Sequence, residues 1–112
     1  MPKSILRTYS KYSHEAVCLM GKLIKLGRKN RKYTTQELAE RAGISRGLLR
    51  RIENGDPKCE IGVVFEVASL VDVRLFNTDD IGLQNHTERV NDKLELLPKT
   101  VRKSKDRVDD DF

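Results

Sequence analysis

Apolar residues recur every three or four positions along most of this chain, which is the spacing of a helix with one apolar face. The first such face predicts a helix from Ser13 to Asn30 and comprises Ala16, Leu19, Met20, Leu23 and Ile24. Lys22, Lys25 and Arg28 fall on the opposite side of that helix. We therefore expect these three cations to face water.

Two shorter helices joined by a sharp turn follow. Thr34 and Glu37 stand three residues apart ahead of an apolar residue, so the hydroxyl and the carboxylate can each satisfy a free backbone N–H group and start a helix near Thr35. Gly43 can adopt the positive φ that ends a helix, and Ser45 can cap the next helix only two residues later. The gap leaves room only for a tight turn.

The helix after this turn is expected to carry arginines on its outer side. Leu49 and Ile52 turn inward at the helical period, and Asn54 with Gly55 ends the helix. The residues left on or beside the outer face are Arg46, Gly47, Leu48, Arg50 and Arg51. Two helices with a basic, exposed second member are typical of proteins that place one helix in the major groove of DNA.

Two further helices are predicted in the second half of the chain. The fourth starts near Ile61 and has a stripe of Val64, Val67, Ala68 and Val71. The fifth spans residues 78–97, with a weaker stripe of Ile81, Val90, Leu94 and Leu97. The only β-like segment, residues 71–76, is short and is expected to be a loop. The predicted fold class is all-α, a compact bundle of about five helices that contains a helix-turn-helix.

The apolar stripe on the fourth and fifth helices is wide for so small a domain. We expect part of it to form the contact between two copies of the chain, through Val64, Val67, Val71, Ile81, Val90 and Leu94. A two-fold dimer places its recognition helices one DNA turn apart, roughly 34–36 Å, so we expect a palindromic operator. Its half-sites would be centred about 10–10.5 base pairs apart or a multiple of that spacing.

The two ends of the chain differ from its middle. Residues 1–12 are basic and polar without helical periodicity, which predicts a flexible arm that either lies along DNA or has no contact. Residues 98–112 carry basic and then acidic charge with few apolar side chains and are expected to be disordered alone. Residues 13–97 would then form one domain that ends in a dimerisation helix.

Charge is distributed unevenly along the 112 residues. The formal net charge is +5, but residues 1–60 hold 14 Lys and Arg against 6 Asp and Glu, a net of +8, whereas residues 61–112 hold 8 against 11, a net of −3. The basic half contains the helix-turn-helix. This asymmetry favours a nucleic-acid partner, because neutralising phosphates releases their counterions.

The exposed residues of the helix-turn-helix suggest distinct roles at DNA. Arg46 and Arg50 lie four residues apart and thus share a side, and an arginine fork matches guanine O6 and N7. Gly47 would let the helix approach the groove floor, and Leu48 offers apolar contact to a thymine methyl group. Phosphate contacts that set the register are expected at the helix ends and the adjoining loop, from Thr35, Gln36, Ser45, Arg51, Asn54 and Lys58.

Other function classes find little support in the sequence. No apolar run approaches the ~20 residues of a membrane span, and no signal-peptide core is visible, so we expect a cytoplasmic protein. Cys18 and Cys59 are interpreted as reduced thiols, and His14 and His86 as isolated residues without a metal. No nucleophile is paired with a base and no glycine-rich phosphate loop is present, so neither an enzyme nor a cofactor is expected.

These residues together resemble a known family. Capping, turn, core and exposed positions over residues 16–76 are similar to the helix-turn-helix of the Xre family, whose members are related in fold to the phage repressors. Xre proteins usually have Gln directly after the cap of the second helix, where it contacts DNA. Here Thr35 holds that place and Gln36 follows it, so either residue could make the contact.

A second resemblance concerns the segments outside the helix-turn-helix. Residues 55–68, the Leu75-Phe76 pair and the ending from Leu97 to Phe112 resemble HipB-type antitoxins. Such proteins are dimeric Xre-family repressors encoded beside a HipA-type serine/threonine kinase toxin. The resemblance implies a repressor that controls its own operon and neutralises that kinase. The alternatives are a stand-alone Xre-type regulator and a protein-interaction module that reuses the fold.

Overall fold

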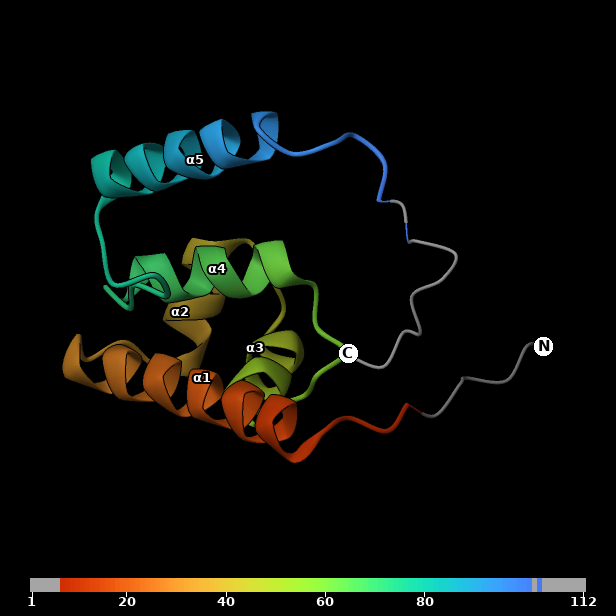
Figure 1. Ribbon diagram of the computed structural model, residues 1–112. Coiled ribbons are helices and arrows are strands. Elements are labelled where there is room, and N and C mark those ends of the chain that lie inside the picture. Colours follow the sequence, from red (N-terminus) through yellow and green to blue (C-terminus); the bar gives the residue numbers. More distant parts are fainter. Residues whose placement is uncertain (1–6, 102, 104–112) are drawn as a thin grey trace. The chain divides into compact units, whose positions relative to one another are not determined.

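The computed structural model describes residues 7–101 and residue 103. Over this range the chain forms helices and no strand, which confirms the all-α class. The helices are α1 (Lys11–Asn30), α2 (Thr35–Ala42), α3 (Arg46–Glu53), α4 (Ile61–Leu70) and α5 (Asp80–Glu95) (Figure 1). Residues 1–6 of the predicted arm, and residues 102 and 104–112 of the predicted tail, lie outside the described residues.

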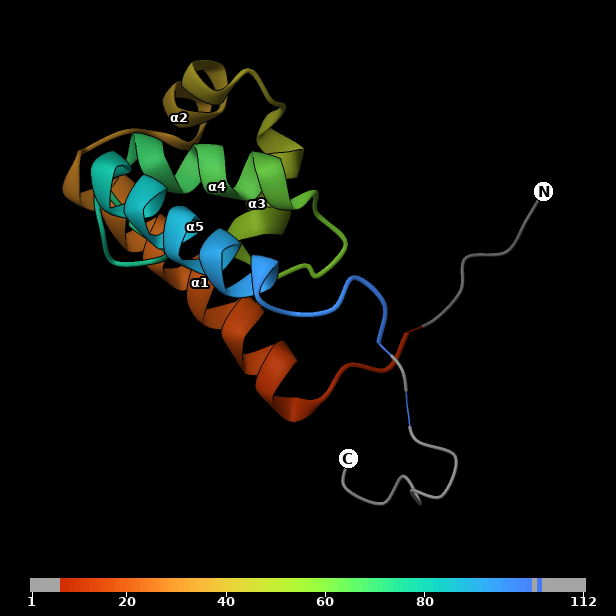
Figure 2. The same ribbon diagram turned by 45° about the horizontal axis from the view of Figure 1, so that its top comes forward.

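The chain divides into two units, with the boundary between Asn77 and Thr78. The first unit contains α1 to α4, and α5 belongs to the second. Within the first unit α2 packs on α3 and α4, and α1 packs on α3 and α4. The short turn that joins α2 to α3 is seen at the top of Figure 2. The expected loop at residues 71–76 is confirmed.

Caps place the helix boundaries. α1 begins two residues before the expected Ser13, because the Ser10 hydroxyl accepts a hydrogen bond from the Ser13 backbone N–H at 3.1 Å. α5 begins two residues later than expected, because the Asp79 carboxylate accepts from the N–H of Gly82 at 2.8 Å. Both caps supply an acceptor for N–H groups that have no partner within the helix.

The core of the first unit is small and draws on all four helices. It consists of Ile24, Leu38, Ala39, Leu49, Ile52, Val67, Ala68 and Val71. α1 contributes less to it than its apolar face predicted. Ile24 is fully buried and Met20 packs at the edge, whereas Ala16, Leu19 and Leu23 are exposed. The described part of the second unit has no comparable core, since none of the side chains of α5 is buried.

Candidate nucleic-acid interface

The first helix of the helix-turn-helix starts with the predicted capping box. The Thr34 hydroxyl accepts a hydrogen bond from the Glu37 backbone N–H at 3.0 Å. The Glu37 carboxylate accepts one from the Thr34 N–H at 2.8 Å, so both N–H groups are satisfied. α2 therefore begins at Thr35, as expected from the sequence.

The turn between the two helices is as short as predicted. Gly43 has φ of 69° and ψ of 33°, a left-handed conformation that residues with a Cβ adopt only with strain. The backbone N–H of Ile44 donates to the carbonyl of Ala39 at 2.9 Å and closes the end of α2. The Ser45 hydroxyl then accepts from the N–H of Leu48 at 3.0 Å, which starts α3 at Arg46. Local chemistry thus determines where α3 begins.

A buried ion pair holds the far end of α3 against α1. The Nε of Arg28 donates to Oε2 of Glu53 at 2.8 Å, and its Nη2 donates to Oε1 at 3.2 Å. The third guanidinium nitrogen, Nη1, donates to the Tyr33 carbonyl at 3.1 Å. The expectation that Arg28 faces water is therefore wrong, because only 9% of the residue is exposed. The pair ties α1, the α1–α2 turn and α3 together.

Sequence reasoning missed this pair, although a signal for Arg28 was present. Arg28 stands four residues after Ile24 and seven after Gly21, and all three are buried on the same face of α1. A cation on the core face of a helix needs a buried carboxylate partner. No pattern in the sequence identifies Glu53 as that partner, because the two residues are 25 positions apart.

A glycine allows α1 and α3 to approach closely. A Cβ on Gly21 would lie 2.5 Å from the carbonyl oxygen of Ile52 and 2.6 Å from that of Glu53. Both atoms belong to the backbone of α3 and cannot rotate away. Gly21 and the Arg28–Glu53 pair therefore fix α3 on α1 at two places.

The outer face of α3 presents two unengaged arginines. Arg46 and Arg50 are exposed, and neither has an ion-pair partner among the described residues. Gly47 lies between them, and a Cβ there would meet nothing closer than the Ser45 hydroxyl at 3.9 Å. Leu48 is different, because it is half-buried against the core and offers less surface than expected.

Arg51 lies beside this face and is engaged. Its Nε donates to the Asp56 carboxylate at 2.8 Å, and the other carboxylate oxygen of Asp56 accepts from the Lys58 backbone N–H at 2.9 Å. The Lys58 N–H bond and then the Arg51 bond hold the pKa of Asp56 below its ordinary value of 3.8. The carboxylate thus stays charged and shapes the loop after α3, where Asn54 and Lys58 are exposed.

The remaining candidate phosphate-binding residues stand near the start of α2 and α3. Gln36 is exposed, and its amide donates to the Glu40 carboxylate at 2.8 Å. Thr35 is half-buried, whereas Ser45 is exposed with its hydroxyl accepting the cap bond. Arg41, next to the end of α2, lies with its guanidinium carbon 4.6 Å from the Tyr33 ring centre. That cation–π contact replaces the Glu37–Arg41 pair that helical spacing alone would suggest.

The structure separates the residues expected to form a dimer contact. Val67 and Val71 are 0% and 4% exposed and belong to the core of their own unit, so they cannot supply surface to a second copy. Val64 is half-buried. Ile81, Val90 and Leu94 on α5 are exposed, at 68%, 53% and 59%.

Both cysteines are free thiols, as expected, and Cys18 has a neighbour that the sequence reading overlooked. The sulfur of Cys18 lies 3.8 Å from Nε2 of His14, one helical turn earlier, so His14 is not isolated. Burial raises the pKa of the Cys59 thiol above its usual 9.0. No group of three or more His, Cys, Asp or Glu gathers within the described residues, and no helix there is long and apolar enough to cross a membrane.

Comparison with known proteins agrees with this geometry. Residues 24–76 match the family model described as "Helix-turn-helix", which supports the resemblance to the Xre family. The match covers α2, α3 and α4 entirely. Searches of curated proteins and of solved structures found no match. Residues 24–76 thus have the helix-turn-helix fold, and the similarity to this family suggests a DNA-binding regulator.

Proposed function

We propose that the protein is a sequence-specific repressor that reads base edges with Arg46 and Arg50. The supporting observation is that these two arginines are exposed on one side of α3 and have no ion-pair partner within the described chain. Arg28, Arg31 and Arg51, by contrast, are all engaged in ion pairs. A guanidinium group that has no ion-pair partner and lies on the recognition helix can form two hydrogen bonds to a guanine.

Gly47 and the helix ends complete the proposed contact. The open surface at Gly47 lets the backbone of α3 approach the groove floor. Leu48 is half-buried, so only the exposed part of its side chain can contact a thymine methyl group. Phosphate contacts are proposed for the ends of both helices and the following loop. Exposure favours Gln36 over Thr35 as the contact at the start of α2, provided that its amide leaves Glu40.

The finer part of the proposal is a dimeric antitoxin in the cytoplasm. We propose that two copies bind a palindromic operator and repress their own operon, and that the protein neutralises a HipA-type kinase toxin. What supports the toxin partner is the resemblance of residues 55–68, of Leu75-Phe76 and of the ending to HipB-type proteins. Phe76 is 66% exposed and stacked on Phe65, with ring centres 6.1 Å apart, and is available to a partner.

The DNA-binding proposal is tested with single arginine variants on a selected operator. Arg46→Ala and Arg50→Ala should each cost about 1–3 kcal/mol on the operator and relax preference at one base per half-site. Arg51→Ala should weaken operator and random DNA alike, with a shallower salt dependence. Arg74→Ala, which removes an exposed arginine in the loop after α4 and outside α2 and α3, is the control and should change neither binding. If Arg46→Ala, Arg50→Ala and Arg51→Ala each lose as much affinity for random DNA as for the operator, the proposed reading face is refuted.

The toxin proposal needs a separate measurement. When the protein is co-expressed with the kinase proposed to be encoded by the neighbouring gene, the two should purify as a complex. Co-expression should also restore growth to cells in which the kinase alone is toxic. Phe76→Ala should weaken the complex without changing operator affinity. A protein that binds its operator but captures no kinase would be a stand-alone regulator.

A further inference from the structure

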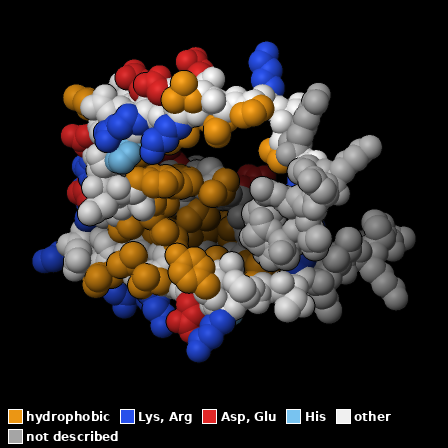
Figure 3. All heavy atoms as spheres, viewed as in Figure 1, with side chains coloured by type: hydrophobic (Ala, Val, Ile, Leu, Met, Phe, Trp, Pro, Cys, Tyr) orange, Lys and Arg blue, Asp and Glu red, His pale blue; other side chains and the backbone are white. Residues whose placement is uncertain are grey.

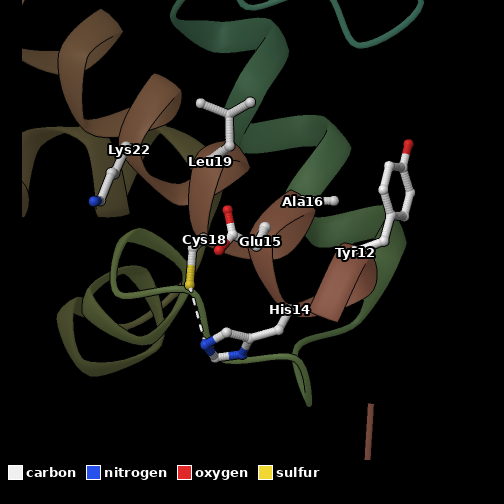
Figure 4. Close-up of a pocket in the computed structure, with 7 residues that line it drawn as sticks. All are labelled: Tyr12, His14, Glu15, Ala16, Cys18, Leu19 and Lys22. Carbon is white, nitrogen blue, oxygen red and sulfur yellow. Dashed lines mark hydrogen bonds between the residues drawn. The ribbon is translucent and has the colours of Figure 1, made fainter. Parts of the chain in front are cut away.

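α1 carries an exposed apolar seam beside its core face. The seam consists of Tyr12, Ala16, Leu19, Leu23 and Leu26, spaced by four, three, four and three residues. Tyr12 is 83% exposed, and Leu19 and Leu26 are more than half exposed. Figure 4 shows Tyr12, Ala16 and Leu19 on one side of α1, away from His14 and Cys18. Four-and-three spacing is that of a helix that packs along another helix.

Hollows flank this seam within the first unit. A cavity of about 380 Å³ lies at one end, lined by Ala16 and Met20 of α1 and by Val64 and Phe65 of α4. A second of about 350 Å³ lies at the other end, beside Leu23, Leu26 and Val71. In Figure 3 apolar side chains gather over α1 and α4. This face can therefore receive large side chains from a packed helix.

α5 carries a seam of the same form. Leu83, Thr87, Val90 and Leu94 are spaced by four, three and four residues on α5, and Leu97 continues this spacing two residues past the end of the helix. The four apolar members are at least 40% exposed. α5 has 16 residues, none of them buried. A helix of this length is marginal in water unless its apolar face is packed. α5 therefore needs a partner surface.

The two seams are similar in length and opposite in charge. The seam of α1 extends over 15 residues, about 21 Å from first to last at 1.5 Å per residue, and that of α5 extends over 12 helical residues from Leu83 to Leu94, about 17 Å. The exposed charges of α1 are four lysines and one glutamate, whereas α5 has four carboxylates against one arginine and one lysine. A basic helix and an acidic helix with matching seams attract each other. Pairs of α1 with α1 or of α5 with α5 are disfavoured, because they bring like charges together.

We propose that α5 of a second copy packs along the seam of α1, and that the exchange is reciprocal. This inference rests on the proposed function, since a palindromic operator requires a two-fold dimer. A two-fold contact is isologous, so α5 on the second copy's α1 implies the same contact in return. One closed dimer then covers both seams of both copies. Pairing of like seams would leave one seam of each chain open and would set like charges together.

The test uses two seam variants, alone and mixed. Leu23→Asp breaks the seam of α1, and Leu94→Asp breaks that of α5. Each should raise the dimer dissociation constant by at least ~100-fold in sedimentation measurements, because a carboxylate would be buried without a partner. Leu96→Asp, off the seam and 85% exposed, is the matched control and should leave the dimer intact. Circular dichroism of each variant checks that the first unit stays folded.

Mixing the two monomeric variants distinguishes exchange from other dimers. In a mixed dimer one α1–α5 pair is intact and the other is doubly broken, so dimerisation should partly return. Three results would overturn the inference: a monomeric wild type at micromolar concentration, a Leu23→Asp protein that remains dimeric, or a mixture without dimers. Operator specificity is measured separately. If the wild type is a monomer that still selects one DNA sequence, only the proposed α5–α1 dimer is refuted. If the wild type forms this dimer but shows no sequence preference, only the proposed repressor function is refuted.

Discussion

Arg28 and Glu53 form a bidentate ion pair between α1 and the last residue of α3, with N–O distances of 2.8 and 3.2 Å. Their side chains are 11% and 6% exposed. Because Arg28 also bonds the Tyr33 carbonyl, one guanidinium links three segments of the first unit. The pair fixes the angle at which α3 leaves the core, and thereby the direction in which Arg46 and Arg50 point.

Removing one partner of this pair should be costly. Glu53→Ala leaves a buried guanidinium without its carboxylate and should lower the free energy of unfolding by about 3–5 kcal/mol. The double variant Arg28→Met with Glu53→Leu should recover most of the loss, since apolar side chains of similar size carry no buried charge. Urea denaturation followed by circular dichroism measures both. Arg31→Ala, which breaks the exposed pair with Asp72, is the control and should cost less than about 1 kcal/mol.

Gly21 should resist substitution. Gly21→Ala sets a methyl group against the Ile52 and Glu53 carbonyls, so α1 and α3 must separate and the protein should lose about 1–3 kcal/mol of stability. Gly62 in α4 provides the comparison, because a Cβ there meets nothing within 4 Å. Gly62→Ala should stabilise the helix by about 0.5–1 kcal/mol. A Gly21→Ala protein that melts at or above the wild-type temperature would contradict the close contact.

Gly47 should show opposite effects on stability and on DNA binding. Its surroundings are open, so Gly47→Ala should raise the free energy of unfolding by about 0.5–1 kcal/mol through helix propensity. Operator affinity should fall, because the added methyl group stands between the backbone of α3 and the groove floor. Denaturation and fluorescence anisotropy on the same preparation provide the two values. Unchanged affinity would mean that this part of α3 stays away from the bases.

Cys59 should react slowly in the folded protein. Burial first, and then the nearby Asp56 carboxylate, raises the pKa of its thiol, so less thiolate is present at pH 8 than in the unfolded chain. Iodoacetamide should modify Cys59 more slowly in buffer than in urea, and in buffer the rate should keep rising with pH beyond 9.0 before it levels off, because the thiolate fraction saturates only above the raised pKa. Peptide mapping by mass spectrometry reports this rate for the single residue. Equal rates in the two solvents would show that Cys59 is not shielded.

Most boundaries of the helix-turn-helix could be predicted because they depend on neighbours. The capping box of Thr34 with Glu37, the left-handed Gly43 and the Ser45 cap each involve residues at most five positions apart. The exposure of Arg46 and Arg50 also follows from the position of Leu49 on the same helix. α1 starts two residues earlier than its apolar period predicts, because that period begins only after the cap at Ser10.

The sequence by itself determined the helices, the tight turn and the basic outer face of α3, since propensity, capping and period act within a few residues. Only the tertiary structure decided which apolar or charged positions lie inside. Arg28 is buried because Glu53 meets it from α3, Val67 and Val71 are buried because α4 packs on α2 and α1, and the Leu19–Leu23 seam of α1 remains open. Helical period shows which residues share a face, but burial depends on what packs against that face, and that contact joins residues far apart in the chain.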